Sequence, residues 1–375
     1  MRHTLPPAAL PQRVHIIGSG LIGTSLAMVL VRAGLSVSVA DSSPTNEALA
    51  ADLSGARRGA GEEVDLVVVA TPPDVTAGVV LDALARWPGA IVTDVASVKG
   101  MVRAELDARR VPGIERYVGG HPMAGRERSG AIAARIDVFE GRPWVVAMTP
   151  DTDPAGVALV RGVAEAAGAV VRALSPLEHD AAVAVVSHVP QVAASLVAAR
   201  LAELSEDAVG LSGTGVRDVT RIAASDPVLW TQILTGNAGA VARELRALAG
   251  DLDRVISALE ELADGTRSDG HVEAPGARGV LARTIAAGNT GHARIPGKHG
   301  AAPTAYALVT VLIPDEPGQL GRLFRDVGDA GINLEELNLE HNLGQPFGQL
   351  ELSVVPAVAG ELTEVLRARG WSVHD

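Results

Sequence analysis

Short apolar runs alternate with amphipathic stretches over the first half of the chain, and this alternation predicts strands joined by helices. Uninterrupted apolar runs, as opposed to alternating ones, are typical of parallel strands covered on both faces. A further amphipathic helix is expected over Asp153–Gly168, and the pattern ends near Leu174. The expected strands are Arg13–Ile17, Ser36–Ala40, Val64–Ala70, Ala90–Val95, Trp144–Met148 and Ala169–Ala173.

From Ser175 the pattern becomes helical. Ser175-Pro176 is a cap followed by proline at the first helical position, and a long Ala/Val/Leu segment runs to Leu204. Asp226-Pro227 repeats this signal. Apolar residues three and four apart over Leu245–Leu262 predict a helix whose stripe is core or a dimer interface. Asp264–Pro303 is interpreted as a connector with one short helix near Val280.

The last seventy residues have the pattern of a separate small domain. Strands are expected at Tyr306–Ile313, Ile332–Glu340, Phe347–Val355 and Trp371–His374, and helices reach Ala330 and cover Val358–Arg369. This is the β-α-β-β-α-β order of ferredoxin-like folds. The predicted fold class is therefore α/β, with a Rossmann-type nucleotide-binding domain (1–174), an all-helical substrate and dimerisation domain (175–298) and a ferredoxin-like domain (304–375).

Composition narrows the class of protein. The net charge of −12 argues against a general affinity for nucleic acid, and the absence of cysteine excludes disulfides and thiolate metal sites; no metal site is expected. Met1–Gln12 lacks the apolar core of a signal peptide. The apolar run Ala181–Ala202 is interrupted by polar residues, which favours a buried helix over a membrane span. A cytoplasmic protein is expected.

The glycine-rich turn G-S-G-L-I-G (Gly18–Gly23) lies between a strand and a helix, the context that a dinucleotide-binding turn requires. Gly18 permits the tight turn, Gly20 lets the backbone approach a pyrophosphate, and Gly23 lets helix pack on strand. Asp41 ends the second strand and is placed to bind ribose hydroxyls; no arginine follows it to hold a 2′-phosphate. The sequence therefore predicts NAD as the cofactor.

Ligands of open α/β sheets bind beyond the carboxyl ends of the strands, so residues following the strands are candidates for the site. Thr71, Asp94, Ser97 and Lys99 occupy such positions. Ser97 is also interpreted as a possible N-cap of the next helix, and the two roles are compatible. The expected cofactor-binding residues are Gly18, Gly20, Leu21, Ile22, Gly23, Asp41, Thr71, Pro72 and Asp94.

Val118–Gly130 reads V-G-G-H-P-M-A-G-R-E-R-S-G, and its glycine content predicts an exposed loop. Its only histidine, His121, is in a poor setting for a core residue. An imidazole in such a loop can take a proton at neutral pH and approach a substrate closely. His121 is therefore the candidate general base, and a structural loop is the alternative.

Further polar residues lie in the helical region. His188 and Gln191 share a face, whereas His179 lies nine residues before His188 and is interpreted as a core histidine; a kink at Pro190 would alter that phasing. Arg217 and Arg221 are four apart and share a face if the segment is helical. One of them is expected to bind a substrate carboxylate, and the other could form an ion pair with Asp218 or Asp226.

These segments resemble the prephenate/arogenate dehydrogenases of tyrosine biosynthesis. The resemblance rests on G-S-G-L-I-G-T-S-L-A, D-V-A-S-V-K, G-G-H-P-M-A-G-R-E-R-S-G, H-D (His179-Asp180) with V-S-H-V-P-Q, and D-V-T-R-I-A-A-S-D-P-V-L-W in family order. It implies NAD-dependent oxidative decarboxylation of prephenate to 4-hydroxyphenylpyruvate, CO₂ and NADH. It also implies His121 as base, Ser97 as the residue orienting the ring hydroxyl, and a substrate site containing Ser187, His188, Gln191 and Arg221.

One departure from the family pattern concerns the substrate. The family commonly has V-S-H-L-P-H, and this chain has Gln191 in place of the second histidine. A neutral amide can accept a hydrogen bond from the ammonium of arogenate. The sequence thus leaves arogenate, alone or beside prephenate, as the alternative substrate.

The last seventy residues resemble an ACT domain, which implies a tyrosine effector near Gly318 and Asn333, or a role in assembly only. A homodimer formed through the helices is expected. A β-hydroxyacid-type dehydrogenase would be expected to carry a catalytic lysine in the helical domain, and Ser175–Leu262 contains none. A non-catalytic NAD and amino-acid sensor is the remaining alternative, disfavoured by the intact Ser97, His121 and Arg221.

Overall fold

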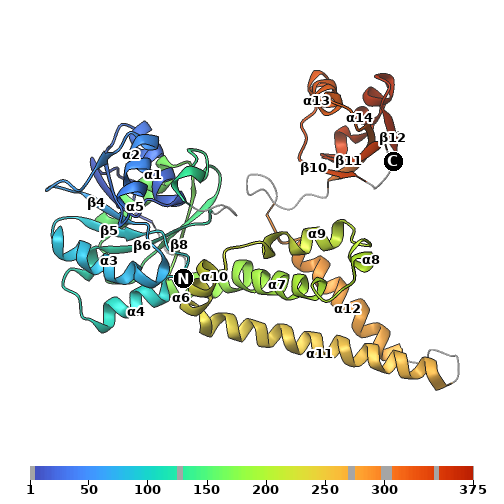
Figure 1. Cartoon of the computed structure of the whole chain (residues 1–375), viewed down its shortest axis with the longest axis horizontal. Coiled ribbons are helices and arrows are strands. Elements are labelled where there is room, and N and C mark those ends of the chain that lie inside the picture. Colours follow the sequence, from blue (N-terminus) through green and yellow to red (C-terminus); the bar gives the residue numbers. More distant parts are fainter. Residues whose placement is uncertain (1–4, 125–129, 269–274, 297–305, 342–345, 375) are drawn as a thin grey trace. The chain divides into compact units, whose positions relative to one another are not determined.

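The computed structural model describes all residues except 1–4, 125–129, 269–274, 297–305, 342–345 and 375. The chain forms two compact units, Met1–Asp251 and Leu252–Asp375. The first unit contains an eight-stranded sheet and the helices that follow it as far as residue 251, and the second contains the remaining part of this helical region and a four-stranded sheet (Figure 1).

The large sheet has the strand order β3-β2-β1-β4-β5-β6-β7-β8. Neighbouring strands are parallel except β6 and β7, which are antiparallel. The strands are β1 (Arg13–Ile17), β2 (Ser36–Ala40), β3 (Arg57–Arg58), β4 (Leu66–Val69), β5 (Ile91–Asp94), β6 (Tyr117–Pro122), β7 (Pro143–Ala147) and β8 (Val170–Leu174). The chain order reverses between β1 and β4, which is where dinucleotides bind in such sheets.

Helices cover both faces of this sheet, as the uninterrupted apolar strands predicted (Figure 1). In β4, Leu66 and Val68 enter one core while Val67 and Val69 enter the other. The first core is closed by α1 (Leu21–Arg32), α2 (Pro44–Ser54) and α5 (Pro154–Ala166), and the second by α3 (Pro73–Arg86) and α4 (Gly100–Ala108).

The helical part begins at the predicted cap. Ser175 and Glu178 form a reciprocal capping box with Pro176 in the first turn, and Asp226 caps the helix that starts at Pro227. The helices are α6 (Pro176–Val183), a π turn (Ala184–His188), α7 (Val189–Leu201), α8 (Glu206–Val209), α9 (Thr214–Thr220), a 3₁₀ turn (Arg221–Ala223), α10 (Pro227–Gly236), α11 (Ala238–Ser268) and α12 (Pro275–His292).

One expectation about this region is confirmed in part and another needs correction. The long apolar segment is one helix over Pro176–Leu201, and a π turn distorts it just before Pro190, whose ring removes a backbone hydrogen bond to the preceding turn. The segment interpreted as a connector is largely helical, since α11 reaches Ser268 and α12 has 18 residues. Its glycines lowered the helical signal without preventing helix formation.

The second unit contains the predicted β-α-β-β-α-β sequence of elements. These are β9 (Ala307–Pro314), α13 (Gln319–Asp329), β10 (Glu336–His341), β11 (Phe347–Val354), α14 (Pro356–Ala368) and β12 (Ser372–His374). The antiparallel order β10-β11-β9-β12 is that of a ferredoxin-like sheet. Apolar residues of its strands and helices form a separate core.

Candidate active site

The glycine turn after β1 is closed by contacts that tolerate no side chain. Gly18 has φ +107°, and a Cβ there would lie 2.3 Å from the carbonyl oxygen of Ala70. A Cβ on Gly23 would lie 2.0 Å from the carbonyl oxygen of Gly18. A Cβ on Gly20, in contrast, would meet nothing within 4 Å. The turn is thus tight against β4 and α1 and open at Gly20, as a pyrophosphate cradle requires.

Asp41 joins the end of β2 to this turn. Its Oδ2 accepts the amide of Ser19 at 2.7 Å, and its Oδ1 accepts the amide of Ser43 at 2.8 Å. These bonds fix the carboxylate and leave further lone pairs for ribose hydroxyls. The nearby Arg58 pairs with Glu47 at 3.0 Å. This arrangement fits the adenosine ribose of NAD.

Two further observations support the fit. The N-cap of α1, Gly20, supplies no side-chain acceptor, so the first amides of the helix remain available to phosphate. The Oγ atom of Ser19 is buried without a hydrogen-bond partner among the described residues, so it is available to a phosphate oxygen.

The other residues predicted to bind the cofactor lie around the same turn. Beyond β4, Thr71 is half-buried and its hydroxyl hydrogen-bonds that of Thr76, while Pro72 is exposed at the N-cap position of α3 and provides no capping hydrogen bond. Leu21 and Ile22 form the first turn of α1.

Asp94 lies at the carboxyl end of β5, but its carboxylate faces the protein interior. Oδ1 accepts the Ala96 amide and pairs with Nζ of Lys99, and Oδ2 accepts the Tyr117 hydroxyl at 2.6 Å. Burial lowers the pKa of Lys99 even beside this carboxylate, and burial together with Asp94 raises that of Tyr117. These contacts give Asp94 an organising role and argue against the expected contact with the cofactor.

Ser97 is not a helix cap. The helix α4 begins at Gly100 with Lys99 as its N-cap residue, and the Lys99 side chain forms no capping hydrogen bond. The carboxylate of Asp180 provides the cap instead, since it accepts the amides of Lys99 and Gly100 at 2.9 and 2.7 Å. Ser97 is half-buried in the loop and has no hydrogen-bond partner among the described residues. Its hydroxyl is therefore available to a ligand.

His121 is on a strand, so the prediction of an exposed loop was wrong for this part of the motif. It lies in β6 and is only 8% exposed. The preceding glycines serve close packing: a Cβ on Gly120 would lie 2.5 Å from the carbonyl oxygen of Asp94, and one on Gly119 would lie 3.1 Å from the Lys99 side chain. Residues 125–129 of the motif lie outside the described residues.

His121 hydrogen-bonds a second histidine that sequence reasoning assigned to the core. Nδ1 of His121 lies 2.8 Å from Nε2 of His179, whose Nδ1 lies 2.7 Å from Oδ1 of Asp180. Because a carboxylate only accepts, His179 donates from Nδ1 and accepts at Nε2. His121 then donates from Nδ1, which leaves the lone pair on its Nε2. That nitrogen has no partner among the described residues.

Hydrogen bonds keep Asp180 ionised, and burial keeps His121 neutral. Burial opposes ionisation of Asp180, but the hydrogen bonds from His179 and the amides of Lys99 and Gly100 outweigh it, so its pKa is lowered. Burial, with His179, Lys99 and His188 nearby, lowers the pKa of His121 well below its usual range. His121 is therefore a neutral base at physiological pH.

The π turn carries the next expected substrate residues. His188 is buried at its end, and Ser187 is half-buried beside it. Nδ1 of His188 lies 3.2 Å from Nδ2 of Asn237, which also donates to the Asp180 carbonyl at 2.7 Å. One turn further, buried Gln191 has Oε1 3.4 Å from the Ser225 hydroxyl and Nε2 3.4 Å from the Ser195 hydroxyl. Asn237 is a site residue that sequence reasoning missed.

Arg221 and Arg217 remain available for a ligand. Arg217 is in α9 and Arg221 is in the 3₁₀ turn that follows, and both side chains are exposed. Within the part of the chain that the structure describes, neither forms an ion pair. The proposed pairing with Asp218 or Asp226 is therefore absent there.

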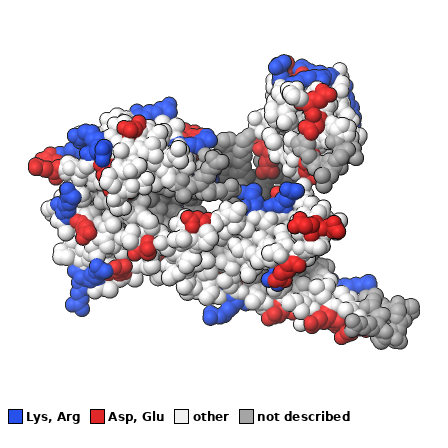
Figure 2. Space-filling view, viewed as in Figure 1, with Lys and Arg blue, Asp and Glu red and all other residues white. Residues whose placement is uncertain are grey.

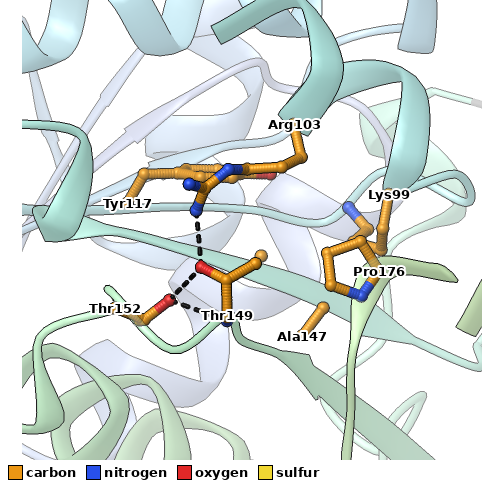
Figure 3. Close-up of a pocket in the computed structure, with 8 residues that line it drawn as sticks. Lys99, Arg103, Tyr117, Ala147, Thr149, Thr152 and Pro176 are labelled. Carbon is orange, nitrogen blue, oxygen red and sulfur yellow. Dashed lines mark hydrogen bonds between the residues drawn. The ribbon is translucent and has the colours of Figure 1, made fainter. Parts of the chain in front are cut away.

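A small pocket borders β6 and β7, and His121 is not among the residues that line it (Figure 3). Arg103 donates to Thr149 at 2.6 Å across it, and Thr149 also bonds Thr152. Its volume of about 10 Å³ holds little more than a water molecule. It does not accommodate an aromatic substrate. Its lining residues are Lys99, Arg103, Tyr117, Gly119, Ala147, Thr149, Thr152 and Pro176.

The fold and these groups define a class of protein. A dinucleotide-type turn after β1, a carboxylate at the end of β2 in position for a ribose, and a neutral, buried imidazole on β6 of the same sheet are the parts of an NAD-dependent dehydrogenase. Residues 26–173 match the family described as "Prephenate dehydrogenase, nucleotide-binding domain", and residues 175–269 match "Prephenate dehydrogenase, dimerization domain".

Individual relatives agree with these matches. The chain is 37% identical to the probable prephenate dehydrogenase NovF of Streptomyces niveus, over 96% of this chain and 98% of that protein. The crystal structure of prephenate dehydrogenase from A. aeolicus with hydroxyphenyl propionate and NAD⁺ has a TM-score of 0.63 at 28% identity, covering 75% and 98% of the two chains. Synechocystis arogenate dehydrogenase has a TM-score of 0.60 at 27% identity, covering 74% and 99%. The chain belongs to the prephenate dehydrogenase family.

Proposed function

We propose that this protein is a prephenate dehydrogenase, which converts prephenate and NAD to 4-hydroxyphenylpyruvate, CO₂ and NADH. The observation that carries the proposal is the chain of hydrogen bonds from His121 through His179 to Asp180. It leaves one lone pair, on Nε2 of His121, free to take a proton. An oxidation at a carbon bearing a hydroxyl needs such a base for the hydroxyl proton.

His121 takes the proton of the ring hydroxyl and later returns it. Nε2 of His121 accepts the hydroxyl proton, and the resulting positive charge is shared along the bonds to His179 and Asp180. NAD bound at the glycine turn would supply the hydride acceptor for the carbon that bears this hydroxyl. Loss of the ring carboxylate as CO₂ then returns its electron pair to the ring and makes it aromatic. His121 gives the proton back to the phenol oxygen, so the protein ends in its starting state.

The remaining expected residues bind and orient the substrate. Ser97 has a free hydroxyl in the loop after β5 and is assigned to the ring hydroxyl. Arg221 has no ion-pair partner among the described residues, and its guanidinium suits a substrate carboxylate. Ser187 and His188 are assigned to the other polar groups of the substrate. We assign the pyrophosphate to the turn at Gly20 and the adenosine ribose to Asp41.

Arogenate is the second candidate substrate, and Gln191 is the observation that favours it. Its amide is buried, and its two hydrogen bonds to Ser195 and Ser225 are both long, at 3.4 Å. The amide oxygen therefore keeps capacity to accept a bond from an ammonium group. A protonated imidazole at this position would repel that group.

The test is NAD reduction by the purified protein, with prephenate and arogenate in parallel and NADP as the control cofactor. Turnover of prephenate is expected, and silence with both substrates in a folded protein that binds NAD would favour the non-catalytic sensor. The variant Gln191→His should raise the preference for prephenate. An unchanged ratio of the two kcat/KM values would contradict the role of Gln191.

We further propose a homodimer in the cytoplasm, formed through the helical part. Pro176–Leu201 is long and apolar enough to cross a membrane, and only 28% of its most apolar window is buried within one chain. Leu177, Val186, Leu196 and Val228 are each more than 60% exposed. The surface over α7 and α10 is mostly uncharged in Figure 2. A second subunit on these helices would cover the apolar surface, and sedimentation as a monomer would contradict the dimer.

Residues 304–375, the C-terminal part of the second unit, are proposed to be an ACT domain that binds tyrosine near Gly318 and Asn333. Gly318 has φ +91° and begins α13 without a side-chain cap, and Asn333 donates to Glu335 at 2.9 Å. The uncapped amides suit the carboxylate of an amino acid. Calorimetric titration should detect tyrosine binding to the full chain. Absence of binding by tyrosine and phenylalanine would leave a role in assembly.

A further inference from the structure

Asn237 holds two parts of the candidate site together through one amide nitrogen. It is the last residue before α11 and is only 6% exposed. Its Nδ2 lies 2.7 Å from the carbonyl oxygen of Asp180 and 3.2 Å from Nδ1 of His188. Asp180 belongs to the chain of hydrogen bonds behind the base, and His188 belongs to the π turn on the substrate side.

The direction of the amide follows from the first of these bonds. A backbone carbonyl only accepts hydrogen bonds, so the atom 2.7 Å from the Asp180 oxygen is the amino group and not the amide oxygen. The amino group has two hydrogens, one for each partner. Nδ1 of His188 therefore accepts, and the hydrogen of its neutral ring resides on Nε2.

The surroundings of His188 favour this neutral ring. The side chain is 1% exposed and packs edge-on against Trp230 at an interplanar angle of 85°. Burial, with His179 nearby and only partly offset by Asp180, lowers the pKa of His188 to about 4. Nε2 of His188 has no hydrogen-bond partner among the described residues. A ligand oxygen can therefore accept a hydrogen bond from the Nε2–H group of His188.

We propose that Asn237 is a positioning residue that fixes His188 as the Nε2–H tautomer and thereby makes it an obligate hydrogen-bond donor to the substrate. As a donor, His188 recognises a carboxylate or keto oxygen and cannot accept a hydrogen bond from an ammonium group. An amine-bearing substrate must direct its ammonium elsewhere, toward Gln191. The identity of the substrate rests on the proposed function, whereas the tautomer of His188 does not.

The same amide couples substrate recognition to the base. By anchoring the Asp180 carbonyl, Asn237 supports the residue whose carboxylate orients His179 and, through it, His121. A change at Asn237 should therefore affect mainly substrate binding through His188 and, to a smaller degree, turnover through Asp180. This split between KM and kcat would not result from a general loss of stability.

The first test uses the wild-type full chain without substrate. Long-range ¹H–¹⁵N NMR of the histidine rings, with His188 assigned by comparison with His188→Gln, reports which nitrogen carries hydrogen. The expected spectrum has Nδ1 of His188 unprotonated and Nε2 protonated at neutral pH. The opposite tautomer, or averaging between the two, would overturn the proposal even if Asn237→Asp does not fold.

The second test replaces the donor by an acceptor. In Asn237→Asp the carboxylate should draw the His188 hydrogen to Nδ1, and KM for prephenate should rise about 10- to 100-fold, as for other partners that orient a histidine. Asn46→Asp on exposed α2 is the matched control and should change neither tautomer nor KM. A wild-type tautomer or an unchanged KM in Asn237→Asp would contradict the proposal. If the wild type turned over neither substrate, the proposed function would fail while the NMR result would still decide the role of Asn237.

Discussion

Nδ1 of His121 lies 2.8 Å from Nε2 of His179, although the two residues are 58 positions apart in the chain. The first is on β6 and the second is on α6, and Asp180 orients the second through its carboxylate. Because this carboxylate also caps α4, the position of the base depends on the docking of the helical part onto the sheet.

Replacing His179 should lower kcat, because His179 accepts the hydrogen bond that orients the base His121. His179→Phe removes the acceptor for the His121 Nδ1 hydrogen, and kcat should fall about 10²- to 10⁴-fold, the range for general-base catalysis. His179→Gln retains an acceptor oxygen and should recover part of this loss. Steady-state kinetics with saturating NAD measure both. Equal activity of the Phe variant and the wild type would contradict the role of the hydrogen-bond chain.

The pH profile should have an acid limb at low pH. A base acts only when unprotonated, so kcat/KM should fall as the pH drops through the pKa of His121. Burial and the neighbouring His179, Lys99 and His188 lower that pKa well below 6.5. Activity should therefore be constant between pH 6.5 and 8 and decline only below this interval. An acid limb centred at or above pH 6.5 would contradict the assignment of the base.

Gly120→Ala should damage the site through the backbone. The new Cβ would lie 2.5 Å from the carbonyl oxygen of Asp94, and relief of this contact must shift β6 against β5. The free energy of unfolding should fall by about 1–3 kcal/mol, as for overpacked cores, and activity should fall with it. Gly78→Ala on α3 is the control, because a Cβ there meets nothing within 4 Å. It should stabilise the helix by about 0.5–1 kcal/mol in urea denaturation.

Asp41→Ser should shift cofactor preference. Removing the carboxylate eliminates an acceptor for the ribose hydroxyls and the charge that repels a 2′-phosphate. KM for NAD should rise at least about tenfold, equivalent to 1.4 kcal/mol, and the ratio of NADP to NAD turnover should increase. The exposed Asp52→Ser on α2 should leave both unchanged. A rise in KM without a change in this ratio would show that Asp41 does not discriminate between the cofactors.

Much of the nucleotide-binding part could be predicted because its signals are local. β1 and β2 have the predicted bounds, and the caps at Ser175 and Asp226 begin helices as expected. Gly18 and Gly23 could be predicted because the glycine motif has a fixed spacing, and in the structure a Cβ at either position would meet backbone atoms. Strand β6 was missed because glycine-rich sequence has low strand propensity, and the close packing that selects Gly119 and Gly120 depends on neighbours distant in sequence.

The sequence by itself determined the parts of this protein: a dinucleotide turn ending at Gly23, an acidic residue at 41, a histidine at 121 and a C-terminal β-α-β-β-α-β segment. Only the tertiary structure decided how the parts combine. A periodic pattern cannot distinguish a histidine in the core from one that supports a base, because both are buried on apolar helices. The partners of His179, Asp180 and Asn237 lie up to about eighty residues away in the chain, and hydrogen bonds between such distant residues form only when the sheet and helices pack together.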